Sequence, residues 1–232
     1  MVAAMGWGAL AAFSLVLGAL LGVVRRWRPD VIGLVLAFGA GALVSAVSFE
    51  LAREGLKVGA PAWVAAGLAA GALAYYALDG ILDRRSGGGG AGPALALGAF
   101  LDGIPEQAVL GIGIATGQGV SVALLVAIFV SNLPEAIGSA SEMRAAGKPR
   151  EVVIRLWLLV AVVCALATAA GYAIAHAASG NLKGAINGFA AGALLVMLVD
   201  SMVPEARRQA GRAAGLVTTL GFAVAAGMSN LS

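Results

Sequence analysis

The sequence predicts an all-α, polytopic membrane protein with eight transmembrane helices in a single domain, residues 1–232. Two features of the composition lead to this fold class: 60% of the residues are hydrophobic and only 12% are charged, whereas soluble domains carry about 25% charged residues. A third is the recurrence of apolar runs near the roughly 20 residues that a spanning helix needs. These features exclude a disordered chain and a soluble enzyme. The single cysteine excludes a disulfide framework and a zinc site built from cysteines.

Breaks in the apolar sequence define the first four spans. The stretch RRWRP (25–29) closes the first span, and the second follows it. GAP (59–61) opens the third, and SGGGGAGP (86–93) separates it from the fourth, which ends at TGQG (116–119). We expect the first span to be retained and not cleaved as a signal peptide, because its basic residues follow the apolar run instead of preceding it.

The remaining four spans follow the same logic, with KP (148–149) separating the fifth from the sixth. The predicted helices therefore cover residues 6–24, 31–52, 61–83, 93–115, 119–143, 152–176, 182–205 and 212–230.

Basic residues are distributed unequally between the two sides of the predicted bundle. Those on one side are Arg53, Lys57 and Lys183, and the other basic residues follow spans one, three, five and seven. Cytoplasmic loops collect Lys and Arg, so this pattern predicts a multi-pass protein of the plasma or inner membrane with both termini outside. The net charge of +3 is explained by these loops, and no nucleic-acid partner is expected.

Two pairs of segments resemble each other across the predicted helices. FGAGALVSAVSFELARE (38–54) matches FAAGALLVMLVDSMVPE (189–205), and DGIPEQ (102–107) matches SNLPEA (131–136). The members of each pair lie on antiparallel spans, so they form inverted repeats. Inverted repeats with proline-interrupted helices indicate the binding site of a transporter. The alternative for the longer pair is that small residues simply allow close helix packing.

Three carboxylates, Asp102, Glu106 and Glu135, fall near the middle of their predicted spans. An ionisable group at this depth costs about 2.5–3.5 kcal/mol on insertion scales. No Lys or Arg lies in the central part of any predicted span, so an internal salt bridge is not available. The carboxylates are therefore either protonated or the ligands of a cation from outside.

The spacing of these residues favours a cation site. Asp102 and Glu106 are four residues apart and share one face of a helix, and Ser131 and Glu135 repeat the arrangement, with Asn132 adjacent. Each Glu follows a proline, which cannot donate a backbone hydrogen bond, so the carbonyls of Leu101 and Val130 lose their usual donors and become candidate oxygen ligands. Gln107 either joins this group or faces another helix. In the alternative interpretation, Glu106 and Glu135 are protonated and hydrogen-bonded across a helix interface.

DGIPEQAVLG (102–111) and SNLPEAIGSA (131–140) resemble the metal motifs in helices four and five of the ZIP (Zrt/Irt-like protein) family of divalent-metal transporters. The segment 189–205 resembles helix seven of that family. The resemblance implies eight helices, both termini outside, a homodimer, and a divalent metal ion as the transported substrate. It implies no enzymatic activity and no organic cofactor.

The resemblance also assigns residues by position. Glu106 and Glu135 match glutamates that bridge two metals in the family, and Gly103 replaces a family ligand, which favours one metal over two. The expected ligands are thus Asp102, Glu106, Gln107, Ser131, Asn132 and Glu135, with Glu50 near a helix-two ligand position and Asp200 near a helix-seven Asp. Carboxylates in place of imidazoles favour harder ions such as manganese, while zinc remains the family default and iron and cadmium are alternatives.

The sequence thus predicts a secondary transporter that carries a divalent cation toward the cytoplasm through the site between helices four and five. One rival is a protein of the same fold that moves protons or a hard cation, because no His or Cys occurs in the motifs. A second rival is an intramembrane enzyme that uses the two glutamates for acid–base chemistry, although no nucleophile accompanies them.

Overall fold

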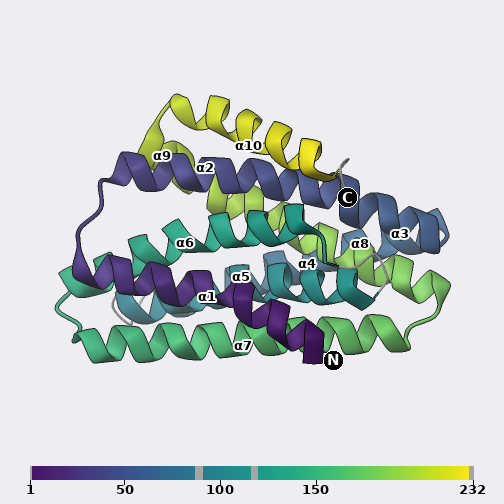
Figure 1. The fold of residues 1–232 in the computed structure, drawn as a ribbon, viewed down its shortest axis with the longest axis horizontal. Helices are drawn as coiled ribbons and strands as arrows, with labels where there is room; N and C mark the ends of the chain where they lie inside the picture. Colours follow the sequence, from purple (N-terminus) through teal and green to yellow (C-terminus); the bar gives the residue numbers. More distant parts are fainter. Residues whose placement is uncertain (1, 87–90, 116–119, 230–232) are drawn as a thin grey trace.

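The computed structural model describes residues 2–86, 91–115 and 120–229, and in these ranges the ordered elements are helices that run along one common direction (Figure 1). The side chains of residues 82, 83, 85, 86 and 91–102 lie outside the description. The helices are α1 (Val2–Val24), α2 (Pro29–Ala46), η1 (Val47–Ala52), α3 (Arg53–Val58), α4 (Pro61–Ser86), α5 (Ala91–Ala115), α6 (Val122–Ala145), α7 (Arg150–Ala177), α8 (Gly180–Met197), η2 (Leu198–Met202), α9 (Val203–Ala210) and α10 (Ala213–Ser229).

Two of the long rods contain a π-helical segment in their interior. The segment η1 joins α2 to α3 without a break, and η2 joins α8 to α9 in the same way. Val47 and Leu198, where the π segments begin, are the tenth residues of the two sequence repeats 38–54 and 189–205. The two copies of the repeat therefore share a backbone feature as well as a sequence pattern. Single-turn π segments inside α-helices are often found at functional sites.

Six helices of the described residues are long and apolar enough to cross a membrane. They start at Val2, Pro29, Pro61, Val122, Arg150 and Gly180, and α10 is a shorter apolar helix of 17 residues. The chain is therefore a helical membrane protein. The described ranges contain eight helical rods, and six of them meet the length and hydropathy expected of a span. The exact number of eight spans stays a prediction.

Several helix ends differ from those predicted. The second rod continues to Val58 and the seventh to Ala210, beyond the predicted ends at 52 and 205. The Arg, Glu, Lys and Gln residues at these ends interrupt the apolar run but are good helix formers. Helix α6 begins at Val122 instead of 119, since the Ser121 side chain accepts a hydrogen bond from the Leu124 amide (3.1 Å) and caps the helix. The predicted break at 116–119 lies outside the described residues.

Glycines bring the backbones of paired helices into direct contact. An ideal Cβ on Gly71 of α4 would lie 1.9 Å from the Phe189 carbonyl oxygen of α8. In the pair α2–α10, an ideal Cβ on Gly41 would lie 1.9 Å from the Thr218 carbonyl oxygen. Only glycine fits at such distances. Close backbone approach is how helices pack in lipid, where burial of apolar side chains supplies no driving force between them.

Glycine contacts of the same kind join α5 and α6, which carry the short repeat, to their neighbours α7 and α1. A Cβ on Gly111 of α5 would lie 2.0 Å from the Thr168 carbonyl oxygen of α7, and one on Gly18 of α1 would lie 2.5 Å from the Leu133 carbonyl oxygen of α6. Helix α1 also packs along α7. Helices α1, α5, α6 and α7 thus form one group, and the pairs α2–α10 and α4–α8 form a second group beside it.

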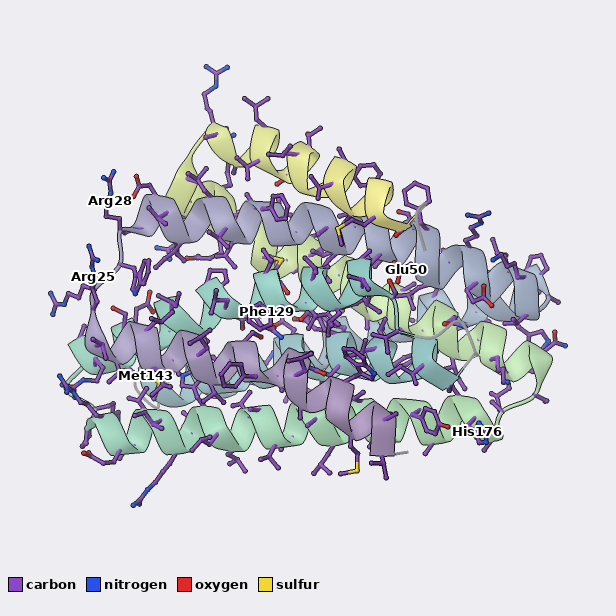
Figure 2. All side chains as sticks on the ribbon, in the orientation of Figure 1. Arg25, Arg28, Glu50, Phe129, Met143 and His176 are labelled. Atoms are coloured by element: carbon purple, nitrogen blue, oxygen red, sulfur yellow. The ribbon has the colours of Figure 1, made fainter. Side chains whose placement is uncertain are left out.

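The two ends of the bundle differ in charge. Figure 2 shows Arg25 and Arg28 at one end and His176 at the opposite end. In Figure 1 both termini lie toward the end opposite the connection between α1 and α2. This arrangement places the C-terminal ends of α1, α4, α6 and α9, near which most of the basic residues lie in the sequence, at one end of the molecule.

Candidate metal site

The centre of the candidate site is a buried hydrogen bond between α5 and α6. Glu106 follows Pro105 within α5 and is only 1% exposed, and Ser131 of α6 is fully buried. The Ser131 hydroxyl lies 3.2 and 3.4 Å from the two oxygens of the Glu106 carboxylate, and 3.0 Å from the Ile128 carbonyl oxygen. One hydroxyl proton therefore has three acceptors within reach, and this contact holds the Glu106 carboxylate against α6.

Asn132, the next residue on α6, is a buried amide with no partner. Its side chain is 1% exposed, and neither the oxygen nor the nitrogen of the amide has a hydrogen bond in the described part of the chain. Buried polar atoms without a partner are rare in folded proteins. An amide oxygen in this condition is suited to bind a cation that enters the site.

Glu135 lies one turn farther along α6, on the same face as Ser131, and is half-buried. Pro134 precedes it within the helix, just as Pro105 precedes Glu106 on α5. Both glutamates therefore follow a residue that leaves a carbonyl without its usual helical donor. The structure brings Glu106 and Ser131 together at the α5–α6 contact. Asn132 is the next residue of α6, and Glu135 lies on the adjoining turn.

Gln107 faces α7 instead of α6. The Thr168 hydroxyl of α7 donates a hydrogen bond to the Gln107 side-chain oxygen at 2.8 Å, and both residues are fully buried. The Gln107 nitrogen has no partner among the described residues. The sequence left open whether Gln107 joins the candidate ligands or faces another helix, and in the structure it faces α7. The Asp102 side chain lies outside the described residues.

Glu50 lies in η1, away from the central pair and toward the end of the bundle opposite Arg25 (Figure 2). Its carboxylate accepts hydrogen bonds from Ser121 at the start of α6 (2.6 Å) and from Ser229 at the end of α10 (3.0 Å). A small cavity of about 30 Å³ lies beside it, and Val109 and Leu110 of α5 line this cavity. Glu50 is therefore about one turn of α5 beyond Glu106 along the bundle.

Asp200 occupies the second π segment, η2, and its side chain is exposed. In the repeat, it aligns with Phe49, the neighbour of Glu50. Among the described residues, no group of three or more His, Cys, Asp and Glu side chains is preassembled as a metal site. The central site instead combines carboxylates with Ser and Asn oxygens.

Sequence reasoning missed several residues that contact the predicted ligands. Thr168 binds Gln107, while Ser121 and Ser229 bind Glu50. Thr168 lies in an apolar helix without a motif, so only the packing of α7 on α5 reveals it. Ser121 was detectable as a helix N-cap, but its contact with Glu50 spans 71 residues of sequence.

A larger hollow lies between the pairs α4–α8 and α5–α7. Its volume is about 720 Å³, and apolar side chains line it almost throughout, including Trp63, Pro105 and Phe189. Pro105 separates this apolar cleft from the Glu106 side of α5. The residues that line the cleft offer no set of oxygen, nitrogen or sulfur ligands for a cation. The candidate metal site therefore lies on the α6 side of α5.

Comparison with known proteins gives one relevant relative. No protein-family model matches the chain. The chain is 28% identical over 221 residues to an Arabidopsis thaliana protein named "Putative zinc transporter". The match covers 90% of this chain but 34% of the relative, so the chain spans about a third of the relative's length. This similarity agrees with the ZIP resemblance of the motifs.

Proposed function

We propose that this protein is a ZIP-like secondary transporter that carries a divalent metal cation across the plasma or inner membrane toward the cytoplasm. The observation that carries the proposal is the buried Glu106 carboxylate, which lies within hydrogen-bond distance of Ser131 in the interior of a membrane protein. Asn132, the residue after Ser131 on α6, is buried without a hydrogen-bond partner among the described residues. The similarity to a protein named as a zinc transporter supports a metal ion as the substrate, with zinc as the leading ion and manganese, iron and cadmium as alternatives.

Charge balance supports a cation at the candidate site. Among the described residues, no Lys or Arg side chain is buried, so a protein cation does not neutralise the site from the interior. A carboxylate in a low-dielectric interior requires a counter-charge or a proton. A divalent cation supplies that charge and occupies the free amide oxygen of Asn132, whereas a proton satisfies only a carboxylate.

The proposed transport cycle uses the two helix groups. The metal ion enters from the Glu50 end, loses water to the oxygens of α5 and α6, and leaves after one group moves against the other. Metal and protons compete for the same carboxylates, so binding releases protons. The basic loops support an orientation with both termini outside, and a homodimer is part of the proposal.

The test is ion uptake into proteoliposomes with Zn²⁺, Mn²⁺ and Cd²⁺ supplied separately. We expect Glu106→Gln to lower zinc uptake by at least about 100-fold, since a neutral amide cannot balance the charge of the ion. Glu142→Gln is the matched control, because this glutamate lies on α6 but is exposed, and its uptake should equal that of the unmodified protein. Metal uptake that persists in correctly folded Glu106→Gln would overturn the proposal.

The same experiment tests the proton transporter. Proton flux without any added metal, abolished by Glu106→Gln, would support proton transport and contradict metal transport. An intramembrane enzyme would show turnover of a lipid-linked substrate that depends on Glu106 and Glu135 and no ion flux at all.

A further inference from the structure

Helix α1 changes from exposed apolar side chains to exposed arginines at its C-terminal end. Leu20 and Val24, one turn apart on α1, are 40% and 76% exposed, and Arg25 and Arg26 follow directly, both exposed. In a helical membrane protein, exposed apolar side chains on a spanning helix contact lipid hydrocarbon, and the first charged residues beyond them lie at the headgroups. The end of α1 therefore marks one headgroup region of the bilayer.

Helix α7 shows the same change near its start. Arg155 is exposed, and the apolar side chains of Val152, Leu158 and Leu159 around it are 48%, 45% and 54% exposed. These positions are three or four residues from Arg155 and so share its face of the helix. An arginine on a face that contacts lipid extends its guanidinium toward the headgroups.

The packing of α1 on α7 brings the two sets of arginines together. The end of α1 and the start of α7 belong to one buried cluster, and the two helices run side by side in opposite directions (Figure 1). An ideal Cβ on Gly8 would lie 2.7 Å from the Thr168 Cβ, a register that sets Arg155 level with Leu21, one turn inside Arg25. An arginine side chain spans about one turn of 5.4 Å, so both guanidinium groups reach the same depth.

These arginines have no counter-charge within the described part of the chain. Arg25 and Arg155 form no ion pair with a described carboxylate, although Glu151 lies one turn before Arg155. The Arg25 guanidinium carbon lies 5.8 Å from the centre of the Trp27 ring, within the range of a cation–π contact. Tryptophan favours the membrane interface, so this contact holds Arg25 at the depth of the headgroups.

We propose that Arg25, Arg26 and Arg155 form a binding surface for the headgroup of an anionic phospholipid, whose acyl chains lie along the apolar faces of α1 and α7. The inference goes beyond the proposed function and does not depend on it. A guanidinium group binds a phosphate through two parallel hydrogen bonds. An anionic lipid supplies the net negative charge that the three arginines lack, whereas the ammonium group of a zwitterionic lipid offsets its own phosphate.

Native mass spectrometry of the detergent-solubilised protein tests the proposal, with dioleoyl phosphatidylglycerol and dioleoyl phosphatidylcholine as probes. We expect the anionic lipid to bind at least about tenfold more tightly, and Arg25→Gln and Arg155→Gln each to weaken it about fivefold, since each basic residue at a membrane surface contributes on that order. Arg53→Gln is the matched control, because Arg53 is an exposed arginine without an ion pair among the described residues, on α3 at the opposite end of the bundle. Its binding should equal that of the unmodified protein.

Three results would overturn the proposal. Equal binding of the two lipids would exclude a preference for anionic headgroups. A loss in Arg53→Gln as large as that in Arg155→Gln would indicate attraction to the overall positive charge without a defined surface. Displacement of the lipid by an equal concentration of inorganic phosphate would indicate a site for free phosphate instead.

A measurement on the unmodified protein keeps the inference testable without any variant. In liposomes, spin-labelled phosphatidylglycerol should be immobilised by the protein more than spin-labelled phosphatidylcholine. The difference should decrease in high salt, because dissolved ions screen exposed charges. A preference that does not change with salt would contradict recognition by the arginines.

Discussion

The second rod, α2–η1–α3, and the seventh rod, α8–η2–α9, are two versions of one structure within the same chain. Each contains a π segment at the same position of the repeat, and each packs through a glycine on a neighbouring helix. Gly41 and Gly192 are equivalent positions, and their ideal Cβ atoms would lie 1.9 and 2.1 Å from a carbonyl oxygen of the partner helix. The two copies of the repeat therefore share this glycine–backbone contact at equivalent positions.

The two rods differ in what their acidic residues bind. Glu50 in η1 is tied to α6 and α10 through two serine hydroxyls, whereas Asp200 in η2 is exposed. The comparison shows that glycine packing defines the architecture of both halves, while a few polar contacts make the two ends of the bundle different. In this structure hydrogen bonds from α6 and α10 to Glu50 hold the η1 end of the bundle together.

The largest effect is expected where the two rods are most alike. Gly41→Leu and Gly192→Leu would each force a side chain into a backbone contact, and we expect each to cost more than about 3 kcal/mol or to prevent folding. Gly215→Leu in α10 is the control, because no atom lies within 4 Å of its ideal Cβ. Thermal unfolding in detergent measures all three. If only one of the two leucine variants remains stable, the two copies of the repeat do not pack in the same way.

An intermediate effect is expected where the rods differ. Glu50→Gln weakens two hydrogen bonds to a charged acceptor, and we expect a loss of about 1–3 kcal/mol in stability. Asp200→Asn should change stability by less than about 0.5 kcal/mol, because surface substitutions away from specific contacts have small effects. Chemical unfolding of both variants checks the contrast. Equal losses of stability in the two variants would show that the hydrogen bonds of Glu50 do not stabilise η1.

The smallest effect is expected at the equivalent residues Glu54 and Glu205. Each pairs with a basic residue three positions later, Glu54 with Lys57 at 3.2 Å and Glu205 with Arg208 at 2.6 Å. Such partly exposed pairs contribute about 0–1 kcal/mol, so Glu54→Gln and Glu205→Gln should each reduce stability by no more than this amount. The reduction should decrease further in high salt. A loss of several kcal/mol at either position would contradict the assignment as a minor surface pair.

The rods, the repeat and the residues of the candidate α5–α6 site could be selected from the sequence because each leaves a local pattern. Apolar runs define the rods, and Pro105–Glu106 and Pro134–Glu135 identify the site by their spacing alone. The partners of these residues leave no such pattern. Thr168 and Cys164 lie in the uniformly apolar α7, and only the register of that helix on α5 shows that they approach Gln107 and Gly103.

The π segments were not predictable for a similar reason. Their sequences, VSFELA and LVDSM, differ in composition and contain no proline or glycine. The backbone there depends on how the whole rod packs against its neighbours, which no single window of sequence contains. The predicted ends of these rods were wrong by six and five residues because apolar composition marks the hydrocarbon boundary, while the helix itself continues into the polar zone.

The apolar cleft between the pairs α4–α8 and α5–α7 has a consequence for the energetics of movement. Water gains almost no hydrogen bonds in a cleft with such walls. If the two helix pairs move against each other during transport, the cleft therefore changes its volume without stripping water from polar side chains. The dehydration penalty that resists motion at a wet interface would then be small.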